Sequence, residues 1–139
     1  MASTVKIDVV TPERGIYSGE VEFVVIPGTM GELGVYPKHA PLLTTLQTGE
    51  LRMKLPEGKE ESIFVSGGFC EILPDQITVL GDVAERADEI DEERAQAAAH
   101  RAEELMKAPT EKVDLSTAEA SIRKSSIRLK IAQKRKKKR

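Results

Sequence analysis

The first part of the chain alternates apolar and polar side chains in short runs. Val5, Ile7 and Val9 are separated by Lys6 and Asp8, the period of a strand with one buried face. Similar runs lie near residues 21–26, 51–55, 63–65, 69–73 and 77–79, and Gly- and Pro-rich turns separate them. Runs of about five residues, with turns every 8 to 12 residues, are typical of a sandwich or barrel. We predict an antiparallel β-sandwich over about residues 4–83.

Two strand assignments depend on the local pattern alone. A short segment is expected at residues 15–18, followed by a turn at Gly19 and Glu20. In the next strand, Val21, Phe23 and Val25 alternate with Glu22, while residues 24 and 26 are also apolar. We therefore expect this strand to be covered on both faces.

The pattern changes after Gly81 and Asp82. Residues 85–107 contain no glycine or proline, and good helix formers dominate. A helix is predicted to begin near Asp88 or Asp91, where an aspartate can cap it, and to stop before Pro109. Its apolar side consists of Ala95, Ala98, Ala99, Ala102, Leu105 and Met106.

A second helix is predicted to start at residues 114–116, because Ser116 and Glu119 fit a capping box. Its apolar stripe consists of Leu115, Ala118, Ile122, Ser125, Leu129 and Ala132. Alanine and serine supply much of this seam, so little apolar area is buried and the hairpin should be able to open. The predicted organisation is α+β: a sandwich over residues 1–86 and a two-helix hairpin with a basic tail over residues 87–139.

Charge divides the chain in the same way. Residues 1–109 hold 10 Lys and Arg against 20 Asp and Glu, whereas residues 110–139 hold 11 against 3. The net charges are −10 and +8, and Lys134 to Arg139 form a basic end that we expect to be disordered in the free protein. Such asymmetry indicates an acidic partner, whether nucleic acid, anionic lipid or an acidic protein surface.

No membrane span or export signal is expected. Mean hydropathy is −0.32, and no run approaches the roughly 20 apolar residues that a span needs. An apolar leader is absent from the first residues, so we expect a cytoplasmic protein. Cys70, the single cysteine, lies in an apolar run and is expected to fill space.

The inventory of reactive residues does not indicate an enzyme. The two histidines, His39 and His100, lie in different elements, and no nucleophile and base are paired by the pattern. Glycines at positions 28, 31 and 34 precede Val35, Tyr36 and Pro37, where a phosphate-binding helix would have to begin. A dinucleotide site is therefore not expected, and neither a metal nor an obligatory cofactor is predicted.

Two features could contact other molecules. The stretch GELGVYPKHAPLLT, residues 31–44, has the glycines and prolines of a chain held in one path. Composition favours a buried structural connection, and the alternative is a loop presenting Glu32 and His39 to another protein. In the hairpin, Lys124 and Arg128 could gather an anion near Asp91 and Arg94, although a cap at Asp91, an Asp91–Arg94 pair and solvated cations are the simpler explanation.

Together, the acidic sandwich, GELGVYPKHAPLLT, the SGG of residues 66–68 and the IDEERA of residues 90–95 resemble the epsilon subunit of bacterial F-type ATP synthase. The resemblance runs in order through about Gln133. It implies a noncatalytic subunit of the rotating central stalk, on the cytoplasmic face of the inner membrane. The sandwich would bind the gamma subunit and rest on the ring of c subunits, with Glu32 and His39 facing that ring.

The resemblance also implies that the hairpin lies on the sandwich or extends toward the alpha and beta subunits, where it blocks ATP hydrolysis. Candidate contacts with the beta subunit are Arg123, Lys124, Arg128 and Lys130. Some bacterial members bind ATP in the folded hairpin, through positions that correspond to Glu85, Ile90, Asp91, Arg94, Lys124 and Arg128. Lys124 departs from that pattern, which has arginine, and lysine lacks the planar fork that grips phosphate. We therefore expect weak ATP binding or none.

A second hypothesis treats the basic end as the arm of a nucleic-acid-binding or adaptor protein. Binding would then fall steeply with salt as counterions are released. The sandwich offers no basic patch interleaved with aromatics, which make up only 4% of the chain. We expect no nucleic acid among the partners.

Overall fold

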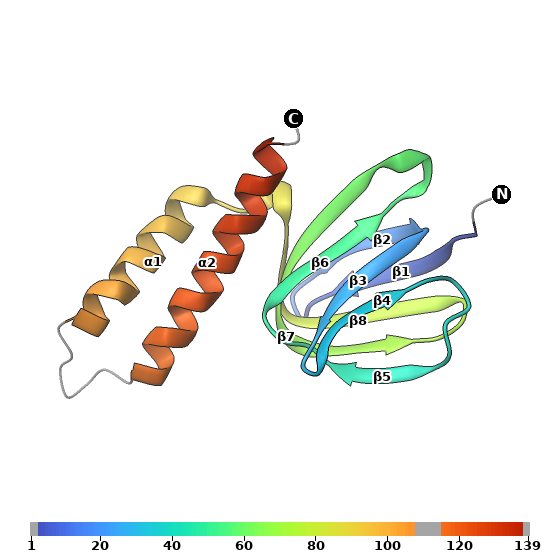
Figure 1. Ribbon diagram of the computed structural model, residues 1–139, viewed down its shortest axis with the longest axis horizontal. Coiled ribbons are helices and arrows are strands. Elements are labelled where there is room, and N and C mark those ends of the chain that lie inside the picture. Colours follow the sequence, from blue (N-terminus) through green and yellow to red (C-terminus); the bar gives the residue numbers. More distant parts are fainter. Residues whose placement is uncertain (1–2, 108–114, 138–139) are drawn as a thin grey trace. The chain divides into compact units, whose positions relative to one another are not determined.

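The computed structural model describes residues 3–107 and 115–137. It divides after Ala87 into two compact units, Met1–Ala87 and Asp88–Arg139 (Figure 1). The strands of the first unit are β1 (Val5–Val10), β2 (Gly15–Val21), β3 (Phe23–Gly28), β4 (Gly31–Val35), β5 (Leu42–Thr45), β6 (Gly49–Lys54), β7 (Glu60–Ile72) and β8 (Gln76–Arg86). The short helix η1 (Pro56–Gly58) joins β6 to β7, and η2 (Ala87–Glu89), α1 (Glu92–Lys107) and α2 (Leu115–Lys137) follow β8.

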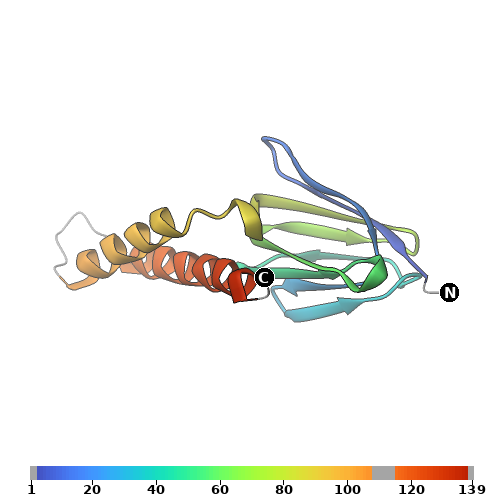
Figure 2. The same ribbon diagram turned by 90° about the horizontal axis from the view of Figure 1, so that it is seen from above.

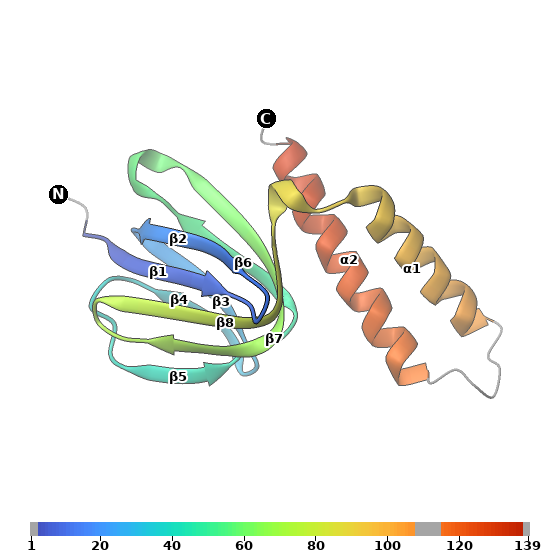
Figure 3. The same ribbon diagram turned by 180° about the vertical axis from the view of Figure 1, so that it is seen from behind.

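The strands form one continuous sheet that folds over into a sandwich. Their order is β2-β1-β8-β7-β6-β3-β4, with β5 pairing β7. Residues 60–65 of β7 pair with β6, whereas residues 69–72 pair with β5, so each half of β7 belongs to a different layer. Figures 1 and 3 view these layers from opposite sides. The pairs are antiparallel except β1 with β8, which is parallel, and the predicted fold class is confirmed.

The fold between layers depends on glycines in β7. Gly67 and Gly68 have φ of +73° and +101°, and a Cβ on Gly68 would lie 2.0 Å from the Leu80 carbonyl oxygen. No L side chain fits there. Val65 and Cys70 are both buried, although an odd separation in a regular strand would put them on opposite faces. The glycine pair thus lets β7 change which of its faces is buried, so that both halves of the strand contribute side chains to the core.

The core lies between the layers and is strongly aliphatic. Its fully covered side chains include Ile7, Val21, Ile26, Leu51 and Ile77. Each comes from a different strand, so burying them stabilises the whole sandwich. At roughly 1.5–3 kcal/mol per buried aliphatic side chain, this core has to offset the backbone entropy of ordering the unit.

Two strand predictions were wrong. β2 continues through Gly19 and Glu20 to Val21, and the chain bends at Glu22 before β3 begins. The next strand is also not covered equally on both faces, as was expected: Val24 and Ile26 face the core, whereas Phe23 and Val25 are only half-buried. The sheet also extends past residue 83, since β8 reaches Arg86 by pairing with Ile63.

The second unit is a hairpin of α1 and α2, which lie alongside each other in antiparallel directions (Figure 2). Asp91 caps α1, because its Oδ1 accepts a 3.1 Å hydrogen bond from the Arg94 amide. The Arg135 guanidinium, near the end of α2, lies 3.7 Å from the Asp88 carboxylate. The start of α1 therefore lies level with the last turns of α2.

Small side chains are prominent among the buried positions of the hairpin. Ala95, Ala102, Ser125, Ile131 and Ala132 are buried on the two helices. Ile131 was not in the predicted stripe, which is wider than expected because Ile127 and Ile131 add a second row one turn apart. The side chains of Leu105, Met106, Leu115, Ser116 and Ala118 lie outside the described residues, and so does the end of the basic tail.

Candidate functional site

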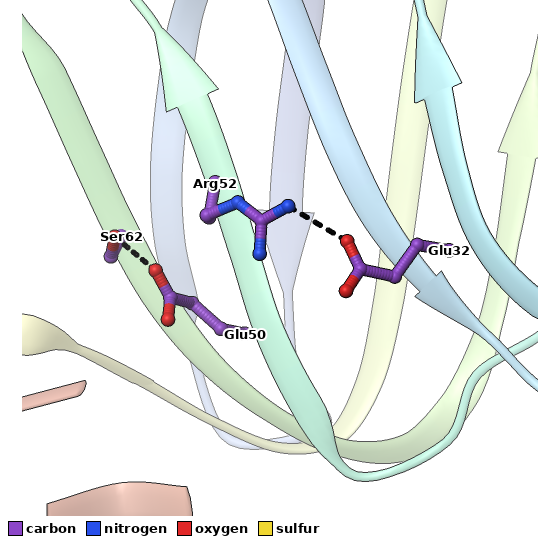
Figure 4. A network of polar contacts seen from close by, with 4 residues as sticks. All are labelled: Glu32, Glu50, Arg52 and Ser62. Atoms are coloured by element: carbon purple, nitrogen blue, oxygen red, sulfur yellow. Dashed lines mark hydrogen bonds and ion pairs between the residues drawn. The ribbon is translucent and has the colours of Figure 1, made fainter. Parts of the chain in front are cut away.

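Glu32 lies on an edge strand of the sandwich and not on a loop. It is the second residue of β4, in register with Pro27 of β3. Its carboxylate receives a 2.7 Å hydrogen bond from Nη2 of Arg52 on β6, with side chains 56% and 41% exposed respectively. Figure 4 shows this pair beside a second one, in which the Ser62 hydroxyl donates to Glu50 at 2.9 Å. Glu32 is therefore exposed to solvent with a guanidinium beside its carboxylate.

His39 lies in the connection from β4 to β5, beyond the other end of β4. Its Nδ1 is 2.6 Å from the Ala40 carbonyl oxygen, and the ring is half-buried. The amide of Lys38 donates to the Pro74 carbonyl at 2.8 Å, which ties the connection to the β7–β8 turn. The prediction that one loop carries both Glu32 and His39 was wrong, because pairing of β4 with β3 separates them by the length of a strand.

The connection is also not buried, contrary to the structural interpretation of residues 31–44. Tyr36, Lys38, Ala40 and Pro41 are all exposed. Composition indicated a fixed path, and the path is fixed by backbone hydrogen bonds at the surface. Lys38 adopts a left-handed φ of +64°, which non-glycine residues seldom adopt.

An exposed apolar face, which no local sequence pattern indicated, lies on the layer that contains β5. Phe69 is in register with Thr45 on one side and Leu80 on the other, and Leu80 is in register with Val10. Phe69 is 45% exposed and Leu43, on β5, is 66% exposed. We call Val10, Leu43, Phe69 and Leu80 the apolar face. Leu43 lies on the same side of the sheet, in register with Glu71, and Val10 is half-buried. Exposed apolar side chains that gather on one face of a small protein suggest an interaction site.

The four predicted cations of α2 separate into two rows. Arg123 and Lys130 are exposed and seven residues apart, so they lie on one side of the helix. Lys124 and Arg128 are half-buried and four residues apart, on the neighbouring side. Only the first row is fully available to a partner with the hairpin closed.

The residues predicted for ATP are not all brought together within one unit. Ile90, Asp91 and Arg94 begin the hairpin, and its antiparallel register places them nearer Arg128 than Lys124. Ile90 is buried, while Asp91 and Arg94 are exposed. The cap at Asp91 is confirmed, but Asp91 binds the backbone amide of Arg94 and not its guanidinium. Glu85 belongs to the other unit, on β8 opposite Phe64.

The described residues show two further negative findings. None of their His, Cys, Asp and Glu side chains gather in threes to hold a metal ion. No described helix is both long enough and apolar enough to cross a bilayer.

Burial raises the pKa of the Cys70 thiol to about 12, which makes that thiol a packing group at neutral pH.

The chain is thus a two-domain protein, in which a β-sandwich with an exposed apolar face is followed by a cationic helical hairpin. Family models agree with this division. "ATP synthase, Delta/Epsilon chain, beta-sandwich domain" matches residues 4–87, and "ATP synthase, Delta/Epsilon chain, long alpha-helix domain" matches residues 88–133. The chain belongs to the ATP synthase epsilon chain family, so the resemblance expected from its motifs is confirmed.

Relatives match over nearly their full lengths. The ATP synthase epsilon chain of Desulforamulus reducens is 47% identical over 133 residues, covering 96% of this chain and 100% of the relative. That of Dehalococcoides mccartyi is 51% identical over 134 residues, covering 95% and 94%. That of Laribacter hongkongensis is 50% identical over 129 residues, covering 92% of each.

Solved structures share the fold at low identity. One is a chain of the Euglena gracilis mitochondrial ATP synthase, described as OSCP/F1/c-ring in rotational state 1 (TM-score 0.68, 23% identity). The match covers 94% of this chain and 78% of that one. Another is a chain of the Tetrahymena thermophila mitochondrial ATP synthase central stalk and c-ring (TM-score 0.61, 13% identity), covering 94% and 97%.

Proposed function

We propose that this protein is the noncatalytic epsilon subunit of the central stalk of a proton-translocating F1Fo ATP synthase. The sandwich binds the gamma subunit and rests on the c-subunit ring, and the hairpin restrains ATP hydrolysis. Family membership supports the assignment, as do structural neighbours described as F1/c-ring and central stalk/c-ring assemblies. The complex holds the protein at the cytoplasmic face of the bacterial inner membrane.

The apolar face is the observation that carries the anchoring role. Leu43 and Phe69 are large apolar side chains that remain well exposed on an otherwise well-packed unit. Covering such side chains with a partner stabilises the complex by roughly 25 cal/mol per Å² of apolar area removed from water. We assign this face to the gamma subunit.

A charge placed on the apolar face tests that assignment. Phe69→Glu should weaken binding of the isolated gamma subunit by about tenfold or more, because an unpaired carboxylate would have to be desolvated. Met30→Glu is the matched control, since Met30 is 95% exposed but lies outside the apolar face. Calorimetry with both variants gives the comparison. Equal affinities for the two variants would show that gamma binds elsewhere.

Glu32 and His39 are the proposed contacts with the polar loops of the c ring. Glu32 lies near the start of β4 and His39 lies beyond its end. A ring that touches both residues must therefore contact a surface about as long as that strand. Arg52 partly neutralises Glu32, so the surface offered at that end combines a carboxylate with a guanidinium. Contacts of this exposed kind select a partner more than they add affinity.

The hairpin is the proposed inhibitory element. Arg123 and Lys130 form an exposed cationic row, and Lys124 and Arg128 join it if the helices separate. An acidic surface of the beta subunit is the partner that this charge fits, with the alpha subunit adjacent. A seam rich in Ala and Ser buries little area, which keeps closed and open arrangements near in energy, as a switch requires.

Removal of α2 tests inhibition. With residues 115–139 deleted, the assembled enzyme should hydrolyse ATP faster and still pump protons, because the sandwich remains in place. Hydrolysis and ATP-driven proton uptake are measured on the same membranes. Arg123→Gln with Lys130→Gln, which keeps the helix, should reproduce part of the increase. An unchanged hydrolysis rate after the deletion removes the inhibitory role.

A further inference from the structure

A pocket at one end of the sandwich is not used by any of these proposed contacts. Its volume is about 520 Å³, within the range of small-molecule sites. Seven residues line it: Ser3, Glu22, Phe23, Tyr36, Pro37, Lys38 and Lys54. They come from the start of the chain, the β2–β3 bend, β3, the β4–β5 connection and the end of β6.

Two aromatic rings form one wall of the pocket. The rings of Phe23 and Tyr36 have centroids 4.5 Å apart and planes tilted by 34°. Phe23 lies over Gly34, where an added Cβ would come within 3.1 Å of its Cζ, so glycine makes room for this ring. Tyr36 is still 66% exposed. It therefore keeps ring surface on which a flat group could stack.

The pocket carries positive charge on an acidic unit. Residues 1–87 contain 7 Lys and Arg against 13 Asp and Glu, yet Lys38 and Lys54 both line the pocket, with Glu22 as the one carboxylate. No ion pair with another described residue engages any of these three side chains. The left-handed φ of Lys38 and the hydrogen bond from its amide to Pro74 hold that lysine's backbone in place. Strained backbone of this kind gathers at binding sites.

We propose that this pocket binds a small anion attached to a flat ring, of the class of aromatic carboxylates. The ring stacks on Tyr36, and the anionic group lies toward Lys38 and Lys54. Glu22 limits the affinity by repelling the same group. The site lies outside the apolar face and the hairpin, but Lys38 adjoins His39, the proposed contact with the c ring. The experiments therefore use the free chain, in which no ring covers the pocket.

The first experiment titrates the full isotope-labelled chain with 2-naphthoate and follows backbone amides by NMR. Shifts should concentrate at residues 22, 23, 36, 38 and 54. Two comparison compounds separate the parts of the ligand: 2-naphthamide keeps the ring without charge, and acetate keeps the charge without the ring. Both should bind more weakly than 2-naphthoate. Absence of shifts at millimolar 2-naphthoate, shifts centred on the apolar face, or equal binding of the amide overturns the proposal.

Variants give changes of opposite sign. Lys54→Gln should weaken 2-naphthoate binding roughly two- to fivefold, as expected for one exposed charge, whereas Glu22→Gln should strengthen it. Lys59→Gln is the matched control, because Lys59 is an exposed lysine that does not line the pocket. Tyr36→Ser should cost about tenfold through lost stacking. Equal effects of Lys54→Gln and Lys59→Gln, or weaker binding by Glu22→Gln, contradict the assignment.

Discussion

Cys70 shows how a single residue's chemistry follows from its place in the sheet. It lies on β7 in register with Val79 of β8, with no exposed surface. Burial raises the pKa of its thiol to about 12, so the thiolate that reacts with disulfide reagents is almost absent at neutral pH. A neighbouring residue, Phe69, points to the opposite face and is half-exposed.

We therefore expect Cys70 to resist 5,5′-dithiobis(2-nitrobenzoic acid) in the native protein. Modification at mildly alkaline pH should proceed at the rate at which the sandwich opens, and denaturant should make it fast. The measurement is the absorbance of released thionitrobenzoate with and without denaturant. Rapid labelling of the folded protein would contradict the packing described for β7.

At the scale of elements, β7 and β8 decide how the sandwich closes. Both strands run through both layers. They pass from one layer to the other at Gly68 and Gly81, which are in register. On β8, Val79 and Ala84 are both buried despite their odd separation, so the change of face seen on β7 is matched by its partner. One backbone bend thus sets which side chains enter the core and which form the apolar face.

Two adjacent glycines allow this bend to be tested. In Gly68→Ala the new Cβ would meet backbone, the Leu80 oxygen at 2.0 Å, whereas in Gly67→Ala it would meet the Asp82 carboxylate, a side chain that can rotate. Both positions have positive φ, which costs about 1 kcal/mol or more for alanine. Gly68→Ala should lower the free energy of unfolding by about 3 kcal/mol or more. Gly67→Ala should lower it less, and urea denaturation would reveal an inverted order.

At the scale of the whole molecule, the residues that the resemblance assigns to ATP are divided between the units. Glu85 belongs to the sandwich, and the other five belong to the hairpin. In the hairpin the Asp91 carboxylate already accepts a hydrogen bond from the Arg94 amide. Lys124 supplies charge without the two-point grip of a guanidinium. The cap at Asp91 and the lysine at position 124 predict weak ATP binding at the hairpin or none.

We expect calorimetry of the full chain with ATP to show no binding that depends on Arg94 below millimolar concentration. Arg94→Ala is the control. Any binding heat that remains in this variant comes from another site, such as the pocket lined by Tyr36. Lys124→Arg should strengthen any Arg94-dependent binding by restoring the planar fork. Micromolar binding that Arg94→Ala abolishes would instead assign ATP to the hairpin.

Local patterns were sufficient for the fold class and for the family. Alternation at Val5, Ile7 and Val9 reports one buried face without reference to any other strand. The cap at Asp91 also needs only neighbouring residues, since its partner is three positions along the chain. The motif over residues 31–44 identified the family through its order of glycines, prolines and apolar residues. These features depend on short-range geometry, which the sequence specifies directly.

Tertiary structure alone decided where the surfaces lie. Val10, Leu80, Phe69 and Thr45 form a row across four strands, and no local pattern records a register between residues so far apart. The separation of Glu32 from His39, and the Glu32–Arg52 pair, likewise follow from strand pairing. The face a strand residue presents reverses at a bend or a one-residue shift. Because long-range pairing fixes both, the sequence determined the elements and the assembled sheet determined what they expose.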